Sequence, residues 1–151
     1  MVVNVSSKSS DWRARDLSNF ARIPFIFDGE PFESVEGFIQ GIKFPEGHVN
    51  RLLGTVCTGI QAKKLGQSAD GKYVWWQGRQ IVFGSDEHHH LIARAIIAKF
   101  DQSSRAMNAL LATEGEEITH DLGLLEDTDT SLPAELFCKV LTEIRKMKTG
   151  E

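Results

Sequence analysis

The chain is organised around the stretch Ser34-Val35-Glu36-Gly37-Phe38-Ile39-Gln40-Gly41-Ile42-Lys43-Phe44. Its first residue, Ser34, belongs to the residue types that cap helix N-termini. The apolar residues at positions 35, 38, 39 and 42 recur with the spacing of one helix face. We therefore predict a short amphipathic helix whose apolar face enters the core of the protein.

Three polar side chains of this helix fall beside its apolar face, and not opposite it. At ~100° per residue, Glu36, Gln40 and Lys43 lie within a stripe about 60° wide. The pattern predicts a carboxylate, an amide and an amine at the border between the core and a cleft. The alternative interpretation is an ordinary amphipathic helix whose rim carboxylate and amine are solvated.

Two glycines form a third stripe on the same helix. Gly37 and Gly41 each cost roughly 1 kcal/mol of helix propensity relative to Ala. Because two such losses fall within one short helix, the simplest explanation of the glycines is that a neighbouring group approaches this side of the helix closely. We expect another backbone or a ligand to contact the helix there.

Length and composition predict one compact domain. The 151 residues, 41% of them hydrophobic, are enough for one sizeable core and too few for two. Residues 1–10 are Ser-rich after a short valine run, so we expect a flexible N-terminal segment before a domain that spans residues 11–151. The net charge of −4 excludes the broad basic surface of a duplex-binding protein.

The residue types indicate no metal, disulfide or cofactor. Cys57 and Cys138 lie outside any CxxC pattern, which favours a reducing compartment. His88, His89 and His90 are consecutive, so on a helix they diverge by ~100° each and cannot converge on one ion. No apolar run approaches ~20 residues and no leader is seen, so we expect a cytoplasmic protein without a membrane span. The oligomeric state stays open.

Turn residues predict one hairpin and are compatible with a second. Asp28-Gly29 separates two short apolar runs, which predicts a β-hairpin over residues 23–32. The segment 73–84 has two interpretations, a second hairpin or an irregular segment. In either one, the adjacent Trp75 and Trp76 point to opposite sides, so one of the two indoles is partly exposed.

Cap residues and apolar spacing predict the other helices. Residues 49–66 have helical spacing, with an apolar face that contains Val49 and Leu52 and an end at Gly66 as the left-handed residue after the last turn. Ser85 caps the clearest helix, whose core face extends to about residue 100, and a further helix covers residues 105–113. A last helix follows Ser131-Leu132-Pro133.

Several segments occur in the order typical of one known family. They are Asp16-Leu17-Ser18-Asn19-Phe20, Ser34-x-Glu36-x-Phe38-x-Gln40-x-x-Lys43-Phe44, Ala62-x-x-Leu65-Gly66, Trp76, Ala98-Lys99-Phe100, Leu110-Leu111-Ala112-Thr113 and Glu143-Ile144-Arg145. Together they resemble the NADAR family, whose bacterial members include YbiA-like N-glycosidases, over about residues 16–146. The pattern in residues 34–44 is the specific part, because it matches several functional positions at once.

The resemblance implies a helix-rich α+β domain that hydrolyses N-glycosidic bonds to ribose. The implied substrates are ADP-ribose attached to guanine, as a nucleotide-type small molecule or in nucleic acid, and phosphoribosylated intermediates of riboflavin synthesis. Glu36 matches the family's essential glutamate, and Lys43 matches the lysine proposed to trap the sugar as a Schiff base. A non-catalytic module that binds ADP-ribose or a related nucleotide is the alternative.

The substrate-binding residues that the resemblance implies come from several segments. They are Ser18, Asn19, Phe20, Gln40, Gly66, Trp76 (or Trp75) and Asp121. Many relatives carry a Trp-Gly-x-Gly run and a Gly-Lys-Asn-Arg-Leu-Gly run before the last helix, and residues 120–133 of this chain depart from both. The family's aspartate and tryptophan therefore have no unambiguous counterparts, and the leaving base stays undetermined.

Cleavage of a ribose–base bond sets the chemistry that such a site must supply. The reaction passes through an oxocarbenium-like state at C1, and Glu36 can serve as its acid/base group. Attack by Lys43 requires a neutral amine, and burial lowers the pKa of an amine whereas a neighbouring carboxylate raises it. Gln40 lies between the two and can hold a ribose hydroxyl. Arg15, Lys63 and Lys64 are candidates for a phosphate contact or ordinary solvated charges.

Overall fold

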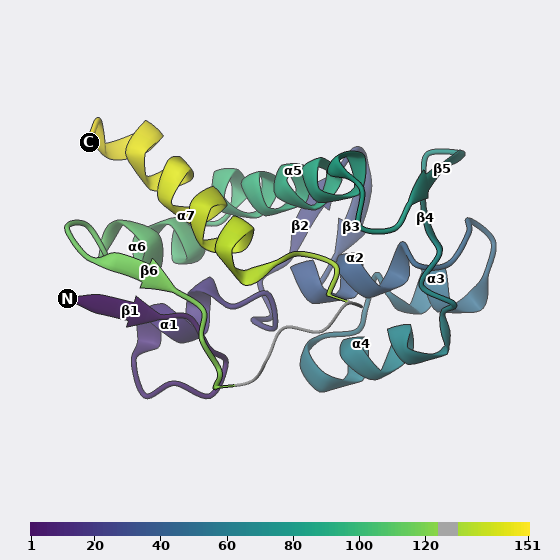
Figure 1. Cartoon of the computed structure of the whole chain (residues 1–151), viewed down its shortest axis with the longest axis horizontal. Coiled ribbons are helices and arrows are strands. Elements are labelled where there is room, and N and C mark those ends of the chain that lie inside the picture. Colours follow the sequence, from purple (N-terminus) through teal and green to yellow (C-terminus); the bar gives the residue numbers. More distant parts are fainter. Residues whose placement is uncertain (124–129) are drawn as a thin grey trace.

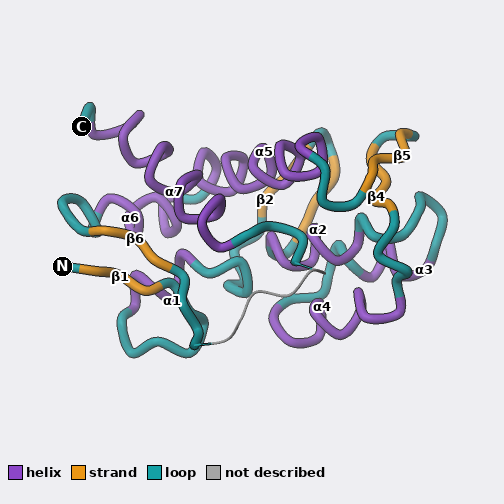
Figure 2. Tube along the Cα trace, viewed as in Figure 1, coloured by secondary structure: helices purple, strands orange, loops and turns teal. Residues whose placement is uncertain are grey.

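The structure, a computed structural model, describes residues 1–123 and 130–151 and shows an α+β fold (Figures 1 and 2). The helices in these residues are α1 (Trp12–Leu17), α2 (Val35–Gly41), α3 (Val49–Leu53), α4 (Gly59–Leu65), α5 (Asp86–Gln102), α6 (Ser104–Leu111) and α7 (Ala134–Thr149), with a 3₁₀ turn, η1, at Gly66–Ser68. The strands are β1 (Val2–Asn4), β2 (Phe25–Phe27), β3 (Glu30–Phe32), β4 (Tyr73–Trp76), β5 (Arg79–Val82) and β6 (Glu117–Thr119). They form three separate pairs: β1 runs parallel to β6, whereas β2 with β3 and β4 with β5 are antiparallel.

Helix α5 connects two groups of elements. Figure 1 shows α1, α6, β1 and β6 gathered at the end that holds both termini, and α2, α3, α4 and the β4–β5 hairpin toward the other end. Helix α5 contacts elements of both groups, α6 on one side and α2 and β5 on the other. Its predicted core face is buried throughout, from Leu91 to Phe100, and the side chain of Ser85 accepts a hydrogen bond from the backbone N–H of His88 as an N-cap.

Helix α2 forms where the residue spacing predicts it. The Ser34 side chain accepts a hydrogen bond of 3.0 Å from the backbone N–H of Gly37. The predicted apolar face is buried, since Val35, Phe38 and Ile42 are fully inaccessible to solvent and Ile39 is nearly so. Burial of the apolar side chains therefore fixes the rotation of α2 about its axis, and with it the direction in which the polar stripe faces.

The glycine stripe of α2 meets another backbone, as the spacing predicts. A Cβ added at Gly37 would collide with the carbonyl oxygens of Gly54 and Cys57, and one at Gly41 would lie 3.2 Å from the Cα of Gly54. The segment that follows α3 therefore packs directly on α2. Only glycines permit this approach, because any side chain would separate the two segments.

The predicted hairpin at Asp28-Gly29 is present, and of the two interpretations of residues 73–84 the structure shows the hairpin. Asp28 and Gly29 adopt positive φ angles of 48° and 84° between β2 and β3, and Gln77 and Gly78 adopt 48° and 78° between β4 and β5. Two consecutive residues with positive φ are typical of the tight turn that matches strand twist. Of the adjacent tryptophans, Trp76 is buried and Trp75 only partly so, which confirms the predicted asymmetry.

The N-terminal residues correct the expectation of a loose segment. Val2–Asn4 forms β1, which pairs with β6 near the other end of the chain, and Val3 and Val5 are buried in the core. The short valine run thus supplies apolar side chains to the core. Residues 6 and 7 then continue to the cavity described below.

Two expectations for residues 49–66 are also corrected. Val49, Leu52 and Val56 are 63%, 69% and 63% exposed, because the end of α3 packs on α2 at Gly54 and the side chain that α3 buries is Arg51. Gly66 has a φ of −75°, so it is not left-handed, and the chain turns there into η1. The reason for a glycine at this position is the space that its missing side chain leaves.

Candidate functional site

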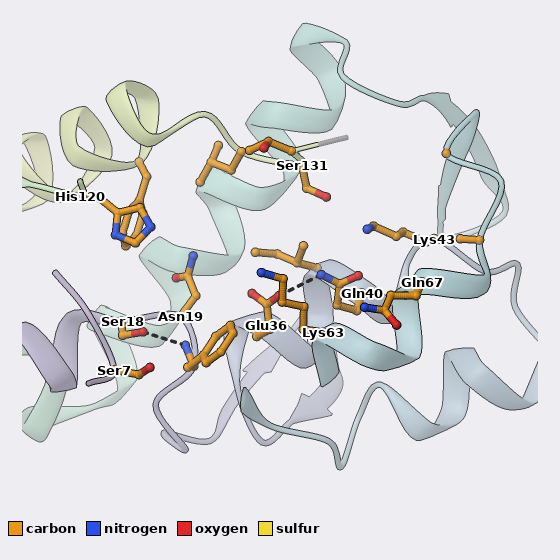
Figure 3. Close-up of a pocket in the computed structure, with 18 of the residues that line it drawn as sticks. Ser7, Ser18, Asn19, Glu36, Gln40, Lys43, Lys63, Gln67, His120 and Ser131 are labelled. Atoms are coloured by element: carbon orange, nitrogen blue, oxygen red, sulfur yellow. Dashed lines mark hydrogen bonds between the residues drawn. The ribbon is translucent and has the colours of Figure 1, made fainter. Parts of the chain in front are cut away.

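A cavity of about 560 Å³ opens beside the polar stripe of α2. Seven of the nine predicted site residues line it, namely Ser18, Asn19, Phe20, Glu36, Gln40, Lys43 and Gly66. Figure 3 shows Glu36, Gln40 and Lys63 along one side, His120 and Ser131 across from them, and Lys43 at one end. The structure therefore brings the predicted carboxylate, amide and amine to one cavity, and the interpretation of α2 as an ordinary solvated helix does not hold.

Glu36 is the buried carboxyl group of the site. Its side chain accepts a hydrogen bond of 2.8 Å from Nε2 of Gln40, and its backbone N–H donates to the carbonyl oxygen of Asn19. Burial raises the pKa of the Glu36 carboxyl, against the smaller opposing effects of the Gln40 hydrogen bond and of the nearby positive charges of Lys43 and Lys63. Since burial disfavours the charged form, the proton is retained to a higher pH than on a solvated glutamate.

Gln40 presents an acceptor to the cavity wall. Its Oε1 is buried and has no hydrogen-bond partner within the described residues. The amide occupies the space beside Gly66, where a Cβ would collide with Oε1. Gly66 is therefore a site residue for a steric reason: only a residue without a side chain leaves room for Gln40 against α4 and η1.

Two amines reach the same cavity. Lys43 follows α2 directly, and its Nζ lies 5.8 Å from the ring centroid of Phe83, which also lines the cavity. Lys63, in the last turn of α4, lies alongside Glu36 (Figure 3). Both positive charges act on the Glu36 carboxyl, and Asp70 adds a second carboxyl group to the lining.

The segment 18–20 is held by a lysine that residue spacing did not identify as functional. Lys99 of α5 is fully buried, and its Nζ donates a hydrogen bond of 3.2 Å to the carbonyl oxygen of Ser18. Burial lowers the pKa of Lys99 to about 7. The Oγ of Ser18 in turn accepts from the backbone N–H of Phe20. The signal in the sequence was a lysine in the apolar face of a helix, where a solvated residue is not expected.

Trp76 lies away from the cavity. Its ring stacks on Phe27 with centroids 5.2 Å apart, and its Nε1 donates a hydrogen bond of 2.8 Å to Asp28. The backbone N–H of Trp75 donates to the carbonyl oxygen of Ile42, which fixes β4 against the end of α2 with Trp76 on the core side. Neither tryptophan lines the cavity, so the structure gives no support to base stacking on Trp76 in this conformation.

Asp121 is exposed and does not line the cavity, whereas the preceding residue does. The Asp121 side chain accepts from the backbone N–H of Gly123, while Asn4 holds the backbone of Asp121 through both its amide nitrogen and its oxygen. His120 faces the cavity instead. Sequence reasoning missed His120 because the pairing of β6 with β1 decides which of the two side chains faces inward. Within the departing segment 120–133, residues 124–129 lie outside the described residues.

Comparisons with known proteins fit this geometry. The sequence pattern of the family described as Bacteriophage protein GP30.3 matches residues 11–146. This protein belongs to that family. It is 31% identical over 140 residues to the uncharacterized 17.1 kDa protein in the Gp30-rIII intergenic region of Enterobacteria phage T4, covering 89% of this chain and 91% of that protein.

The fold of this GP30.3-family protein is also found in a bacterial protein. The NMR structure of the E. coli protein YbiA matches with a TM-score of 0.69 and 20% sequence identity, covering 98% of this chain and 84% of YbiA. The GP30.3 family is of the NADAR type, so the predicted NADAR/YbiA-like assignment and the α+β fold class are both confirmed.

Two further properties concern the described residues alone. They contain no cluster of three or more His, Cys, Asp or Glu side chains suited to a metal ion. No helix among them is long and apolar enough to cross a membrane. The chemistry available to the cavity from these residues is thus that of two carboxyl groups (Glu36 and Asp70), two amines, an imidazole and several hydroxyl and amide groups.

Proposed function

We propose that this GP30.3-family protein is an N-glycosidase that hydrolyses the bond between ribose and a base. The substrate class is an ADP-ribosylated guanine, as a nucleotide or within nucleic acid, or a phosphoribosylated intermediate of riboflavin synthesis. One observation carries the proposal: Glu36, buried and hydrogen-bonded to Gln40, shares a cavity with the amine of Lys43. The family membership supports the same substrate class.

Glu36 serves as the acid/base group. Departure of the base leaves the bonding electrons on a ring nitrogen, which needs a proton, while C1 of the ribose becomes oxocarbenium-like. A carboxyl group that burial keeps protonated at a higher pH than usual is suited to donate that proton. After donation, the resulting carboxylate stabilises the positive charge that has formed on the sugar.

Lys43 is the proposed nucleophile that traps the sugar. Its amine can add to C1 and open the ribose ring to an imine, which water then hydrolyses. Figure 3 shows Lys43 at one end of the cavity and Glu36 nearer to its middle, so one sugar can lie between the two groups. Gln40, whose Oε1 has no partner among the described residues, is placed to accept from a ribose hydroxyl.

The size of the cavity supports a nucleotide-type ligand. About 560 Å³ falls within the range of ~300–1,000 Å³ that is typical of small-molecule sites. The amines of Lys43 and Lys63 supply positive charge for a phosphate group. Phe20 and Phe83 supply the partly exposed rings of the lining, and these rings replace Trp76 as candidates for contact with the base.

Base release by purified protein tests the proposal. ADP-ribosylated guanosine, ADP-ribosylated DNA and the phosphoribosylated riboflavin precursors are each incubated with the protein, and free base is measured by mass spectrometry. We expect Glu36→Gln to reduce base release by at least ~10²-fold, the usual contribution of a general acid. The matched Glu143→Gln variant, on an exposed residue of α7, keeps wild-type turnover. Undiminished turnover by Glu36→Gln would remove Glu36 from the mechanism.

Borohydride reduction during turnover tests the role of Lys43. Reduction of an imine attaches the mass of the sugar to the lysine, and peptide mapping locates it. We expect the adduct on Lys43 and none in the Lys43→Arg variant. Turnover without any adduct would exclude the imine and leave direct attack by water.

The second candidate is a non-catalytic module that binds ADP-ribose or a related nucleotide. The observation that favours it is the placement of Trp76 and Asp121, two predicted site residues that do not line the cavity. Calorimetry distinguishes the two functions: tight binding of ADP-ribose together with no release of any base would support the binding module.

A further inference from the structure

His120 is a functional group of the cavity that neither residue spacing nor the family resemblance assigned. It follows β6 directly, its ring lies edge-on against Phe137 with centroids 5.4 Å apart, and it lines the cavity across from Glu36 (Figure 3). In its protonated form His120 favours ionisation of the Glu36 carboxyl, so the two groups lie within electrostatic reach of each other. The cavity thus has one acid/base group on each of two walls.

A backbone carbonyl group determines which ring nitrogen of His120 carries the hydrogen and which has a free lone pair. Nδ1 lies 2.8 Å from the carbonyl oxygen of Val5. A carbonyl oxygen only accepts hydrogen bonds, so Nδ1 carries the hydrogen. In the neutral ring, Nε2 is therefore the acceptor, and it is the nitrogen left for the cavity.

The sheet around His120 holds it in place. The backbone N–H of Val5 donates to the carbonyl oxygen of Thr119 at 2.8 Å, so the strand pairing extends to the residue next to His120. On its other side, Asn4 binds the backbone amide and carbonyl groups of Asp121. A side chain fixed at three neighbouring positions is prepositioned, which is a requirement of acid/base catalysis.

We propose that His120 is the general base of the reaction, resting on the proposed N-glycosidase function. The lone pair of Nε2 accepts a proton from the water that adds to C1 of the sugar. On the imine route this addition gives a carbinolamine; the imidazolium then returns its proton to the Lys43 nitrogen, the C1–Nζ bond breaks, and the hydroxyl proton passes to solvent as the carbonyl group forms. On the direct route, the C1–N bond breaks toward the base and the Glu36 carboxyl donates its proton to that base. A C1–O bond forms as the water proton passes to Nε2, and the proton on the imidazolium then returns through solvent to the Glu36 carboxylate.

The variant His120→Asn tests this role with little disturbance of the structure. The amide nitrogen of asparagine takes the place of Nδ1 and keeps the hydrogen bond to Val5, while the acceptor at the position of Nε2 is lost. We expect turnover of ADP-ribosylated guanosine to fall by about 10²-fold. The matched control is His90→Asn, on an exposed histidine of α5, which keeps wild-type turnover.

Two readouts separate a general base from a structural role. Azide needs no deprotonation, so added azide restores turnover of His120→Asn and yields a ribosyl azide that mass spectrometry detects. The second readout uses a 4-nitrophenyl riboside, whose leaving group needs no proton. With this substrate we expect Glu36→Gln to regain turnover relative to wild type and His120→Asn to remain slow. If His120→Asn does not fold, as judged by circular dichroism, the same two readouts are applied to His120→Gln.

The outcomes distinguish this proposal from the proposed function. An active wild-type protein whose folded His120 variant retains more than half of its turnover overturns the role of His120 alone. The role is also overturned if azide fails to restore turnover of the His120 variant while the 4-nitrophenyl riboside does restore it. That result would make His120 a general acid. A wild-type protein that releases no base and no nitrophenol from any probe overturns the N-glycosidase function itself.

Discussion

Helices α2 and α3 are both short and both carry apolar residues at helical spacing, yet only α2 buries its apolar residues. Helix α2 places Val35, Phe38 and Ile42 in the core, fully inaccessible to solvent. Helix α3 leaves Leu52 exposed and buries Arg51, which donates to the carbonyl oxygens of Phe44 and Trp75. Apolar spacing thus indicates that a helix has a distinct face, while the backbone contacts of its neighbours decide whether that face is buried.

The contact between these two helices explains the difference. Gly37 and Gly41 of α2 lie against Gly54 at the end of α3, so the backbones touch before any side chain can intervene. This approach turns the Arg51 side of α3 inward and its apolar side outward. The same packing leaves the other border of α2, with Glu36 and Lys43, free to line the cavity.

The largest effect is expected from truncation of the buried face. Phe38→Ala removes a ring that packs edge-on against Phe27 and Phe32, and should lower the free energy of unfolding by ~3–5 kcal/mol. Leu52→Ala, the matched change on α3, should alter it by no more than ~0.5 kcal/mol, because the side chain is already solvated. Urea denaturation measures both. Equal losses would show that the two faces are equivalent in solution.

A graded pair of glycine substitutions tests the backbone contact. A Cβ at Gly54 would lie 2.7 Å from the Cα of Gly41, and one at Gly41 would lie 3.2 Å from the Cα of Gly54. Gly54 has a φ of −59°, so its substitution strains the packing and not the backbone conformation. We expect Gly54→Ala to destabilise the protein by ~1–3 kcal/mol and Gly41→Ala by less, as measured by thermal unfolding. The reverse order would contradict the packing of α3 on α2.

The buried lysine of α5, Lys99, should make the free energy of unfolding depend on pH. Because the pKa of Lys99 is lowered from 10.5 to about 7, the unfolded chain binds a proton between those values that the folded protein does not bind. The contribution of Lys99 to the free energy of unfolding therefore rises with pH across that window, by at most ~1.4 kcal/mol per pH unit.

Lys99→Met removes this slope. Urea denaturation of both proteins at several pH values between 7 and 10.5 measures it, with the exposed Lys64→Met as the matched control that keeps the wild-type slope. An unchanged slope in Lys99→Met would mean that the amine is solvated in solution.

The smallest effect is expected on the exposed face of α3. Replacing Val49, Leu52 and Val56 together by serine should change the free energy of unfolding by less than ~1 kcal/mol and leave base release unaltered, since these side chains contact mainly solvent. Denaturation and the base-release assay measure the two quantities. A larger loss of stability would show that part of this face is buried in solution.

Caps, residue spacing and turn residues were enough to predict several of the helices and a hairpin. The cap and spacing of residues 34–44, the Asp28-Gly29 turn and the Ser85 cap each gave the correct element, because the interactions involved span only a few residues. The spacing of residues 34–44 identified Glu36, Gln40 and Lys43, and the family resemblance implied Ser18, Asn19, Phe20 and Gly66, and all seven line the cavity. Trp76, Asp121 and the apolar face of α3 could not be placed correctly this way, since burial depends on which distant segment packs against each one.

The sequence by itself determined that α2 exists, that Glu36, Gln40 and Lys43 share one of its borders, and that the chain contains a hairpin at Asp28-Gly29 and a long helix capped by Ser85. The tertiary structure alone decided that β1 belongs to the core, that Gly66 makes room for Gln40 and that His120 faces the cavity. The physical reason is the range of the interactions. Helix periods and turn angles are set by neighbours within a few residues, whereas the hydrogen bond between Val5 and His120 joins residues 115 positions apart.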